Sequence, residues 1–229
     1  MPKRILVVVT STAKYPEMLR PTGLWLGEAV HFVDVVQAAG WQVDFVSPAG
    51  GYTPIDPASL GPMAEPIDWD YYQNPDFMRR LGATLRPDQV KAEDYAAIYF
   101  AGGHGVIWDF PDHVGLQALA RRIYEEGGVV ASVCHGAVAL LNIIMPSGNH
   151  LIAGKVVTGF SNEEERLAEL DQHVPFLTEA ELRKRGAVYR RAPQPFTPFA
   201  VTCDRIVTGQ NPQSGRAVAE HVLALIGKP

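Results

Sequence analysis

The chain has 229 residues, which suits one large domain or two small ones. Hydrophobic residues make up 47% and charged residues 20%, a balance that excludes a disordered chain, a coiled coil and a collagen-like fibre. The formal net charge of −5 leaves no basic excess to neutralise phosphates, so we expect neither nucleic acid nor an anionic membrane as a main partner.

The two cysteines, Cys134 and Cys203, are too few for a disulfide framework and are expected to be free thiols in a reducing compartment. No apolar run reaches the roughly 20 residues that a membrane helix needs. The first residues lack the cleavage pattern of a signal peptide. We therefore expect a cytoplasmic protein.

Short apolar runs typical of buried strands alternate with longer runs at helical spacing. In chain order the predicted elements are strand 5–9, helix 26–39, strand 41–46, strand 96–101, helix 116–126, strand 129–133, helix 137–144, strand 156–157, helix 163–170, helix 178–185, strand 188–190, strands within 199–207 and helix 213–226. This alternation predicts an α/β protein with a parallel sheet between two layers of helices.

Residues 48–87 are irregular and rich in proline and aromatic side chains. A structureless loop of that length is unusual inside a compact domain. We expect a covering lobe or part of a dimer contact, with a short helix near 76–81. A long surface insertion is the alternative.

A cysteine stands where a buried strand is predicted to end and a helix to begin, in Ala131-Ser132-Val133-Cys134-His135-Gly136. A sharp strand-to-helix turn of this kind is a nucleophile elbow, which projects its nucleophile above the sheet. Free N–H groups and the dipole at a helix N-terminus favour an anion, so we expect a Cys134 thiolate with a lowered pKa. Cys203 has no such setting and is expected to be structural.

Two other features accompany the elbow. The turn Gly102-Gly103-His104-Gly105 follows a buried strand, and the N–H groups of Gly103 and His135 could form an oxyanion hole there. Glu28 lies in an apolar helical run, where burial would raise its pKa and keep it protonated. A solvated helix glutamate is the alternative. No Gly-x-Gly-x-x-Gly or phosphate loop is present, so no nucleotide cofactor is predicted.

Together, Glu28, the 102–105 turn and the 131–136 elbow resemble the ThiJ/PfpI superfamily of class I glutamine amidotransferase-like proteins. Residues 47–51, 158–165 and 208–212 extend the likeness to the larger-chain branch, which contains glyoxalase III and heat-inducible holding chaperones. The resemblance implies one domain over 1–229, a flavodoxin-like three-layer sandwich with a mostly parallel central sheet and a small irregular covering lobe.

The resemblance also implies a role for each matching residue. Cys134 would be the nucleophile, His135 its neighbouring base and Glu28 the buried acid that touches the thiolate. Gly103 and His135 would supply the oxyanion-hole N–H groups, and His104 would line the pocket.

An acidic partner for His135 is implied within residues 163–165, where Glu165 is favoured over its two neighbours. At least two of these glutamates are expected to lie in a solvated first helical turn, capped by Asn162.

The remaining histidines do not predict a metal site. His31 lies three residues from Glu28, so a metal pair on one helix face stays an alternative. His113, His150 and His173 show no ligand spacing, so neither a metal nor another cofactor is predicted. His221 follows a glutamate, the reverse of the late His-x-Glu order in true glutaminases, so a glutaminase subunit is not expected.

The function that the resemblance implies is a cofactor-independent glyoxalase. It would convert a small 2-oxoaldehyde such as methylglyoxal to a 2-hydroxy acid, through addition of the Cys134 sulfur and without glutathione. The alternatives are a deglycase for protein or nucleotide, an amidase or peptidase, a redox sensor at Cys134, and a holding chaperone that binds unfolded client proteins through residues 48–87. The resemblance also implies a homodimer.

Overall fold

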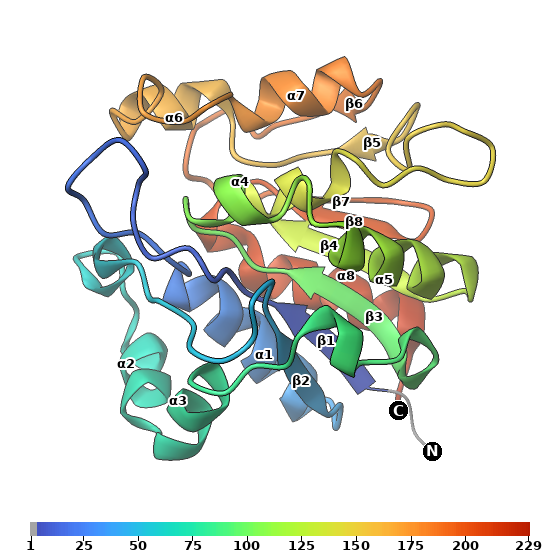
Figure 1. Cartoon of the computed structure of the whole chain (residues 1–229), viewed down its shortest axis with the longest axis horizontal. Coiled ribbons are helices and arrows are strands. Elements are labelled where there is room, and N and C mark those ends of the chain that lie inside the picture. The colour runs from blue at the N-terminus through green and yellow to red at the C-terminus, as the bar shows by residue number, and fades with distance from the viewer. Residues whose placement is uncertain (1–3) are drawn as a thin grey trace.

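The computed structural model describes residues 4–229, and its centre is a six-stranded sheet with the order β2-β1-β3-β4-β8-β7 (Figure 1). Five strands are parallel and the edge strand β7 is antiparallel to β8. The strands are β1 (Arg4–Val8), β2 (Val43–Val46), β3 (Tyr95–Phe100), β4 (Val129–Val133), β7 (Ala200–Cys203) and β8 (Ile206–Gly209). The mostly parallel sheet predicted from the sequence is confirmed.

Helices cover both faces of this sheet. On one face, α1 (Leu26–Ala38) and α8 (Gly215–Ile226) share a core with alternate strand residues such as Ile5 and Val7. On the other face, α5 (Val114–Glu125) and α7 (Thr178–Lys184) share a second core with Leu6. Because side chains alternate along a strand, a continuous apolar run such as that of β1 buries both faces.

Smaller elements complete the fold. A separate parallel pair consists of β5 (Val156–Val157) and β6 (Val188–Tyr189). The short helices are α4 (Val106–Asp109), α6 (Asn162–Leu167) and the 3-10 helices η3 (Ala92–Asp94) and η5 (Pro212–Ser214). No helix in residues 4–229 is long and apolar enough to cross a membrane.

Residues 48–87 are more ordered than expected. They contain η1 (Pro57–Leu60), α2 (Pro66–Gln73), α3 (Pro75–Leu81) and the start of η2 (Pro87–Gln89), and they lie beside α1 (Figure 1). The helix near 76–81 is confirmed, but α2 was not predicted. Each of these helices begins with proline, which suits a first helical position because it needs no N–H partner there.

One predicted helix has a different form. Residues 137–144 were expected to be α-helical, whereas a 3-10 helix, η4 (Cys134–Leu140), begins at the cysteine itself. Its backbone packs tightly on β3, since a Cβ added at Gly136 would lie 2.2 Å from the Phe100 carbonyl oxygen. The expected strand region 199–207 is likewise two strands, which turn at Asp204 with a φ of 53°.

A pair of leucine substitutions tests this core. Leu6 is 0% exposed in β1, whereas Leu19 is 109% exposed in the loop that follows β1. We expect Leu6→Ala to lower the free energy of unfolding by about 2–5 kcal/mol and Leu19→Ala to change it by less than about 0.5 kcal/mol. Urea unfolding followed by circular dichroism measures both, and equal losses would contradict the assigned core.

Candidate active site

Cys134 occupies the predicted nucleophile elbow. It follows β4 directly and has a φ of +56°, a left-handed conformation that is uncommon for a residue with a side chain. The residue is 3% exposed and lines a cavity at the carboxyl ends of the parallel strands. The strained backbone directs the sulfur to the sheet edge at which α/β proteins place their sites.

Glu28 lies in the first turn of α1 and is fully buried. Its Oε2 accepts a hydrogen bond of 2.6 Å from the Gly102 N–H. Burial raises the pKa of Glu28 to about 8, while the nearby Cys134 thiol and the hydrogen bond from Gly102 lower it by less. The predicted burial of Glu28 is confirmed, and the raised pKa favours the neutral carboxyl group at pH 7.

The surroundings of Cys134 favour the thiol over the expected thiolate. Burial raises the pKa of the Cys134 thiol well above its ordinary value, and the charge of an ionised Glu28 acts in the same direction. The predicted lowering of this pKa is wrong because the sulfur is withdrawn from water and the helix behind it is a short 3-10 segment. Protonation of Glu28 removes its repulsion, but the nucleophile still needs a base.

His135 is positioned as that base. Its Nδ1 lies 3.4 Å from the Cys134 sulfur, and its Nε2 lies 2.7 Å from Glu165 Oε2. Burial lowers the pKa of His135, so the imidazole is neutral and can accept a proton. The resemblance favoured Glu165 among residues 163–165 as the partner of His135, and the structure shows this contact.

Glu165 also binds a second imidazole. Its Oε1 lies 2.7 Å from Nε2 of His104, which follows β3 in the glycine-rich turn. Burial alone would raise the pKa of Glu165, but its electrostatic interaction with His135 and the hydrogen bonds with His104 and His135 hold it well below its usual range. A buried carboxylate thus lies between two histidines, whose ring centroids are 4.1 Å apart.

The other two glutamates of the triplet differ from each other. Glu163 is partly exposed, with 45% of its side chain open to solvent, and pairs with Arg191, as expected for a solvated first turn. Glu164 is fully buried, so the expectation of two solvated glutamates is wrong. Its side chain forms a capping box with Ser161, which caps α6 in place of the predicted Asn162. The Ser-x-x-Glu spacing is the sequence signal for this arrangement.

Gly103 has no room for a side chain. Its φ is +103°, and an added Cβ would lie 2.2 Å from the Gly23 carbonyl oxygen. Gly103 and His104 both line the cavity with Cys134 and His135. The structure therefore brings together all six site residues expected from the sequence, although it does not assign their roles.

The cavity has a volume of about 280 Å³ and a largely apolar wall. Residues that the sequence did not single out supply most of that wall: Tyr15, Arg20, Trp25, Asp56, Ala58, Met63, Phe160, Leu167, Ala168, Leu170, Phe196 and Pro212. The position of Tyr15 and Arg20 after β1 was the available signal, because loops at the carboxyl ends of strands form α/β sites.

One group of residues could hold a metal ion. Ligand atoms of His104, His135 and Glu165 all lie within 4.8 Å of one another. A metal would have to replace the two hydrogen bonds that this carboxylate now accepts. The alternative pair of His31 and Glu28 is not formed, since His31 Nε2 lies 3.1 Å from Asp68 Oδ1.

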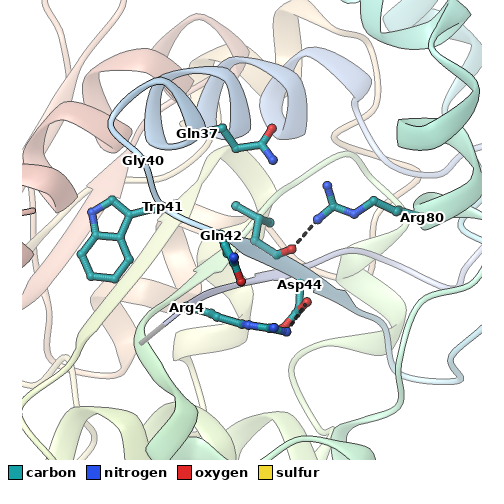
Figure 2. Close-up of a pocket in the computed structure, with 8 residues that line it drawn as sticks. Arg4, Gln37, Gly40, Trp41, Gln42, Asp44 and Arg80 are labelled. Carbon is teal, nitrogen blue, oxygen red and sulfur yellow. Dashed lines mark hydrogen bonds and ion pairs between the residues drawn. The ribbon is translucent and has the colours of Figure 1, made fainter. Parts of the chain in front are cut away.

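A second groove, at the amino ends of β1 and β2, lacks chemistry of this kind (Figure 2). Arg4 pairs with Asp44 at 3.0 Å, and Arg80 donates to the Val43 carbonyl oxygen. Its charged groups are thus engaged with each other or with backbone, and the groove lies at the sheet edge opposite Cys134.

A left-handed cysteine elbow, a buried acid and a glycine-rich turn define this site. The family model described as DJ-1/PfpI family matches residues 4–225. The chain belongs to the DJ-1/PfpI family.

Several members of this family are similar to the chain over nearly its full length. The glutathione-independent glyoxalase HSP31 of Saccharomyces cerevisiae is 32% identical over 227 residues, which cover 95% of each protein. Glyoxalase III of Candida albicans has a crystal structure that matches with a TM-score of 0.90 and 30% identity, covering 98% of this chain and 97% of that one. The Rapid Encystment Protein of 24 kDa from Francisella tularensis matches with a TM-score of 0.93 and 33% identity, covering 98% and 99%.

The buried acid makes stability depend on pH. The unfolded chain releases the Glu28 proton near its ordinary pKa of 4.5, whereas the folded protein keeps it until about pH 8. The free energy of unfolding of the wild type therefore falls as the pH rises from about 4.5 to about 8. Glu28→Gln lacks this titration, so its free energy of unfolding minus that of the wild type should rise by about 1.4 kcal/mol per pH unit.

Urea unfolding at about pH 5 and about pH 7.5 measures this difference. Glu17→Gln is the matched control, since Glu17 is exposed. A Glu28→Gln difference that is the same at both pH values would show that the carboxyl group is already ionised in the folded protein.

Proposed function

We propose that this protein is a glutathione-independent glyoxalase, which converts a small 2-oxoaldehyde such as methylglyoxal to the 2-hydroxy acid. The observation that carries the proposal is the chain of contacts from the Cys134 sulfur to His135 at 3.4 Å and from His135 to Glu165 at 2.7 Å, beside a cavity. The glyoxalase names of full-length relatives support it.

The first step forms a covalent adduct. The sulfur of Cys134 adds to the aldehyde carbon while Nδ1 of His135 accepts the thiol proton, and the Glu165 carboxylate stabilises the resulting imidazolium. The N–H groups of Gly103 and His135 stabilise the developing alkoxide. His135 then returns the proton to this oxygen, and a hemithioacetal results.

The second step is an isomerisation. The proton on the former aldehyde carbon moves to the neighbouring ketone carbon through an enediol, which converts the hemithioacetal to a thioester. Water then hydrolyses the thioester, releases the 2-hydroxy acid and restores the thiol. Every atom of the product comes from the aldehyde and one water molecule, so no external oxidant or reductant is needed.

The role of Glu28 is to stabilise the Cys134 sulfur as a thiolate. Its protonated carboxyl group lies next to Cys134 and lacks the charge that would oppose a thiolate. A neutral acid in this position donates a hydrogen bond to the sulfur when the thiol proton leaves. Glu28 therefore stabilises the leaving thiolate during hydrolysis as well as the nucleophile during addition.

The two free cysteines give a direct test of this function. Incubation of the purified protein with methylglyoxal should yield lactate, measured enzymatically after removal of the protein. We expect Cys134→Ala to lower kcat/KM by about 10³-fold or more, because the nucleophile is lost. Cys203→Ala should retain wild-type activity. No lactate from wild type, or equal activity of Cys134→Ala, would refute the proposal.

A holding chaperone is the second candidate. Exposed apolar and aromatic side chains gather in the 48–87 lobe, namely Tyr52, Met63, Trp69 and Tyr72. Such side chains suit contact with the apolar segments of unfolded client proteins. The glyoxalase site does not need them, apart from Met63 at the cavity wall.

Aggregation assays separate this candidate from catalysis. We expect Cys134→Ala to suppress light scattering by the reduced insulin B chain as well as wild type does. The double variant Trp69→Ser, Tyr72→Ser should lose most of the suppression and keep glyoxalase activity. Unchanged suppression by the double variant would exclude these side chains as the client surface.

We also propose a homodimer located in the cytoplasm. The dimer rests on family membership, and the location rests on the two free thiols. Sedimentation velocity of the purified chain tests the first, and fluorescence microscopy of a tagged chain tests the second.

A further inference from the structure

We propose that His104 is a second catalytic base, which carries the proton between the two substrate carbons while His135 serves the sulfur. This inference rests on the proposed glyoxalase function and assigns its isomerisation step to a residue. The structural basis is the carboxylate of Glu165, which binds the Nε2 atoms of His104 and His135 at 2.7 Å each.

The shared carboxylate fixes the tautomers of both imidazoles. A carboxylate can only accept hydrogen bonds, so each Nε2 atom that contacts it carries the proton. In a neutral imidazole the other nitrogen then has a free lone pair. His135 and His104 therefore each present Nδ1 as a proton acceptor, and each would become an imidazolium stabilised by the same Glu165.

The two acceptors serve different places. Nδ1 of His135 contacts the Cys134 sulfur at 3.4 Å. Within residues 4–229, Nδ1 of His104 has no hydrogen-bond partner. It is also not one of the fully buried side-chain atoms that lack a partner there. Both residues line the cavity, where the bound substrate carbons would lie.

The reaction moves protons at two different places, the sulfur and the substrate carbons. The thiol proton moves during addition and again during hydrolysis, whereas the proton on carbon moves once between them. The ring centroids of His104 and His135 are 4.1 Å apart, so one adduct can reach both. His135 keeps its place at the sulfur, and His104 approaches the adjacent carbons from the neighbouring turn.

Proton transfer by His104 conserves atoms and electrons. Nδ1 of His104 takes the proton from the carbon bonded to sulfur, the C–H electron pair forms the carbon–carbon double bond, and the ketone oxygen becomes an enediolate. Nδ1 of His104 then gives its proton to the second carbon, the hydroxyl proton of the first carbon moves to the second oxygen, and the thioester carbonyl forms. The step is an isomerisation without net oxidation.

Two substitutions, His104→Gln and His104→Ala, distinguish a catalytic role of His104 from a structural one. His104→Gln keeps an amide donor for Glu165 but cannot accept the proton. We expect its kcat with methylglyoxal to fall by about 10²-fold or more and its KM to change by less than about threefold. The C1-deuterated aldehyde should show a larger isotope effect on kcat than in wild type. Imidazole added to His104→Ala should restore at least about tenfold in rate.

Two controls accompany these variants. His173→Gln makes the same chemical change at an exposed histidine and should match wild type. The rate of Cys134 alkylation by iodoacetamide in His104→Gln should stay within about twofold of wild type, because His135 and Glu165 still serve the sulfur.

Each outcome decides the question. Wild-type kcat in His104→Gln overturns the inference and leaves the glyoxalase function intact. Parallel loss of turnover and of Cys134 alkylation, without imidazole rescue, would make His104 a positioning residue and also overturns it. Lost turnover with intact alkylation and imidazole rescue supports it. Absence of lactate from wild type refutes the underlying function as well.

Discussion

The buried carboxylate of Glu165 is the constraint on which the site depends. A charge withdrawn from water is costly unless hydrogen bonds replace its solvent, and here two imidazole N–H groups do so at 2.7 Å. The elements that carry these groups are fixed independently: His104 and His135 follow the neighbouring parallel strands β3 and β4, and Glu165 lies on α6, whose start is held by the Ser161–Glu164 capping box. The positions of the proton acceptors follow from this one carboxylate.

Glu28 and Cys134 are both buried. Burial raises the pKa of both Glu28 and Cys134, which favours the protonated form of each group. A resting thiol that is unionised is a weaker nucleophile than a thiolate, but it is also less exposed to unproductive reactions. The strength of the nucleophile then arises from proton transfer to His135 at the moment of addition.

Much of the architecture could be predicted from the sequence, because short apolar runs rich in β-branched residues are typical of strands buried on both faces. The elbow and the glycine turn were also visible, since tight turns need small residues at fixed offsets. Three features depended on tertiary contacts and were missed. Helix α2 was not predicted because the prolines of this segment were read as breaking regular structure, whereas Pro66 begins the helix. The direction of the Cys134 pKa shift was predicted wrongly because the burial of a side chain depends on contacts that the neighbouring residues in the sequence do not reveal. The burial of Glu164 depends on Asn211, which lies 2.9 Å away and 47 positions along the chain.

Segments from different parts of the chain form the cavity wall. Met63 of the 48–87 lobe and Leu167 at the end of α6 both line it, with 47% and 58% of their surface open to solvent. Neither residue belongs to the six-stranded sheet, whose strands position the cysteine and the histidines. Changes in the length or side chains of these two segments can therefore widen or narrow the opening while the reacting groups stay in place. Admission of a molecule and its conversion are thus separable properties of this fold, and each can evolve without loss of the other.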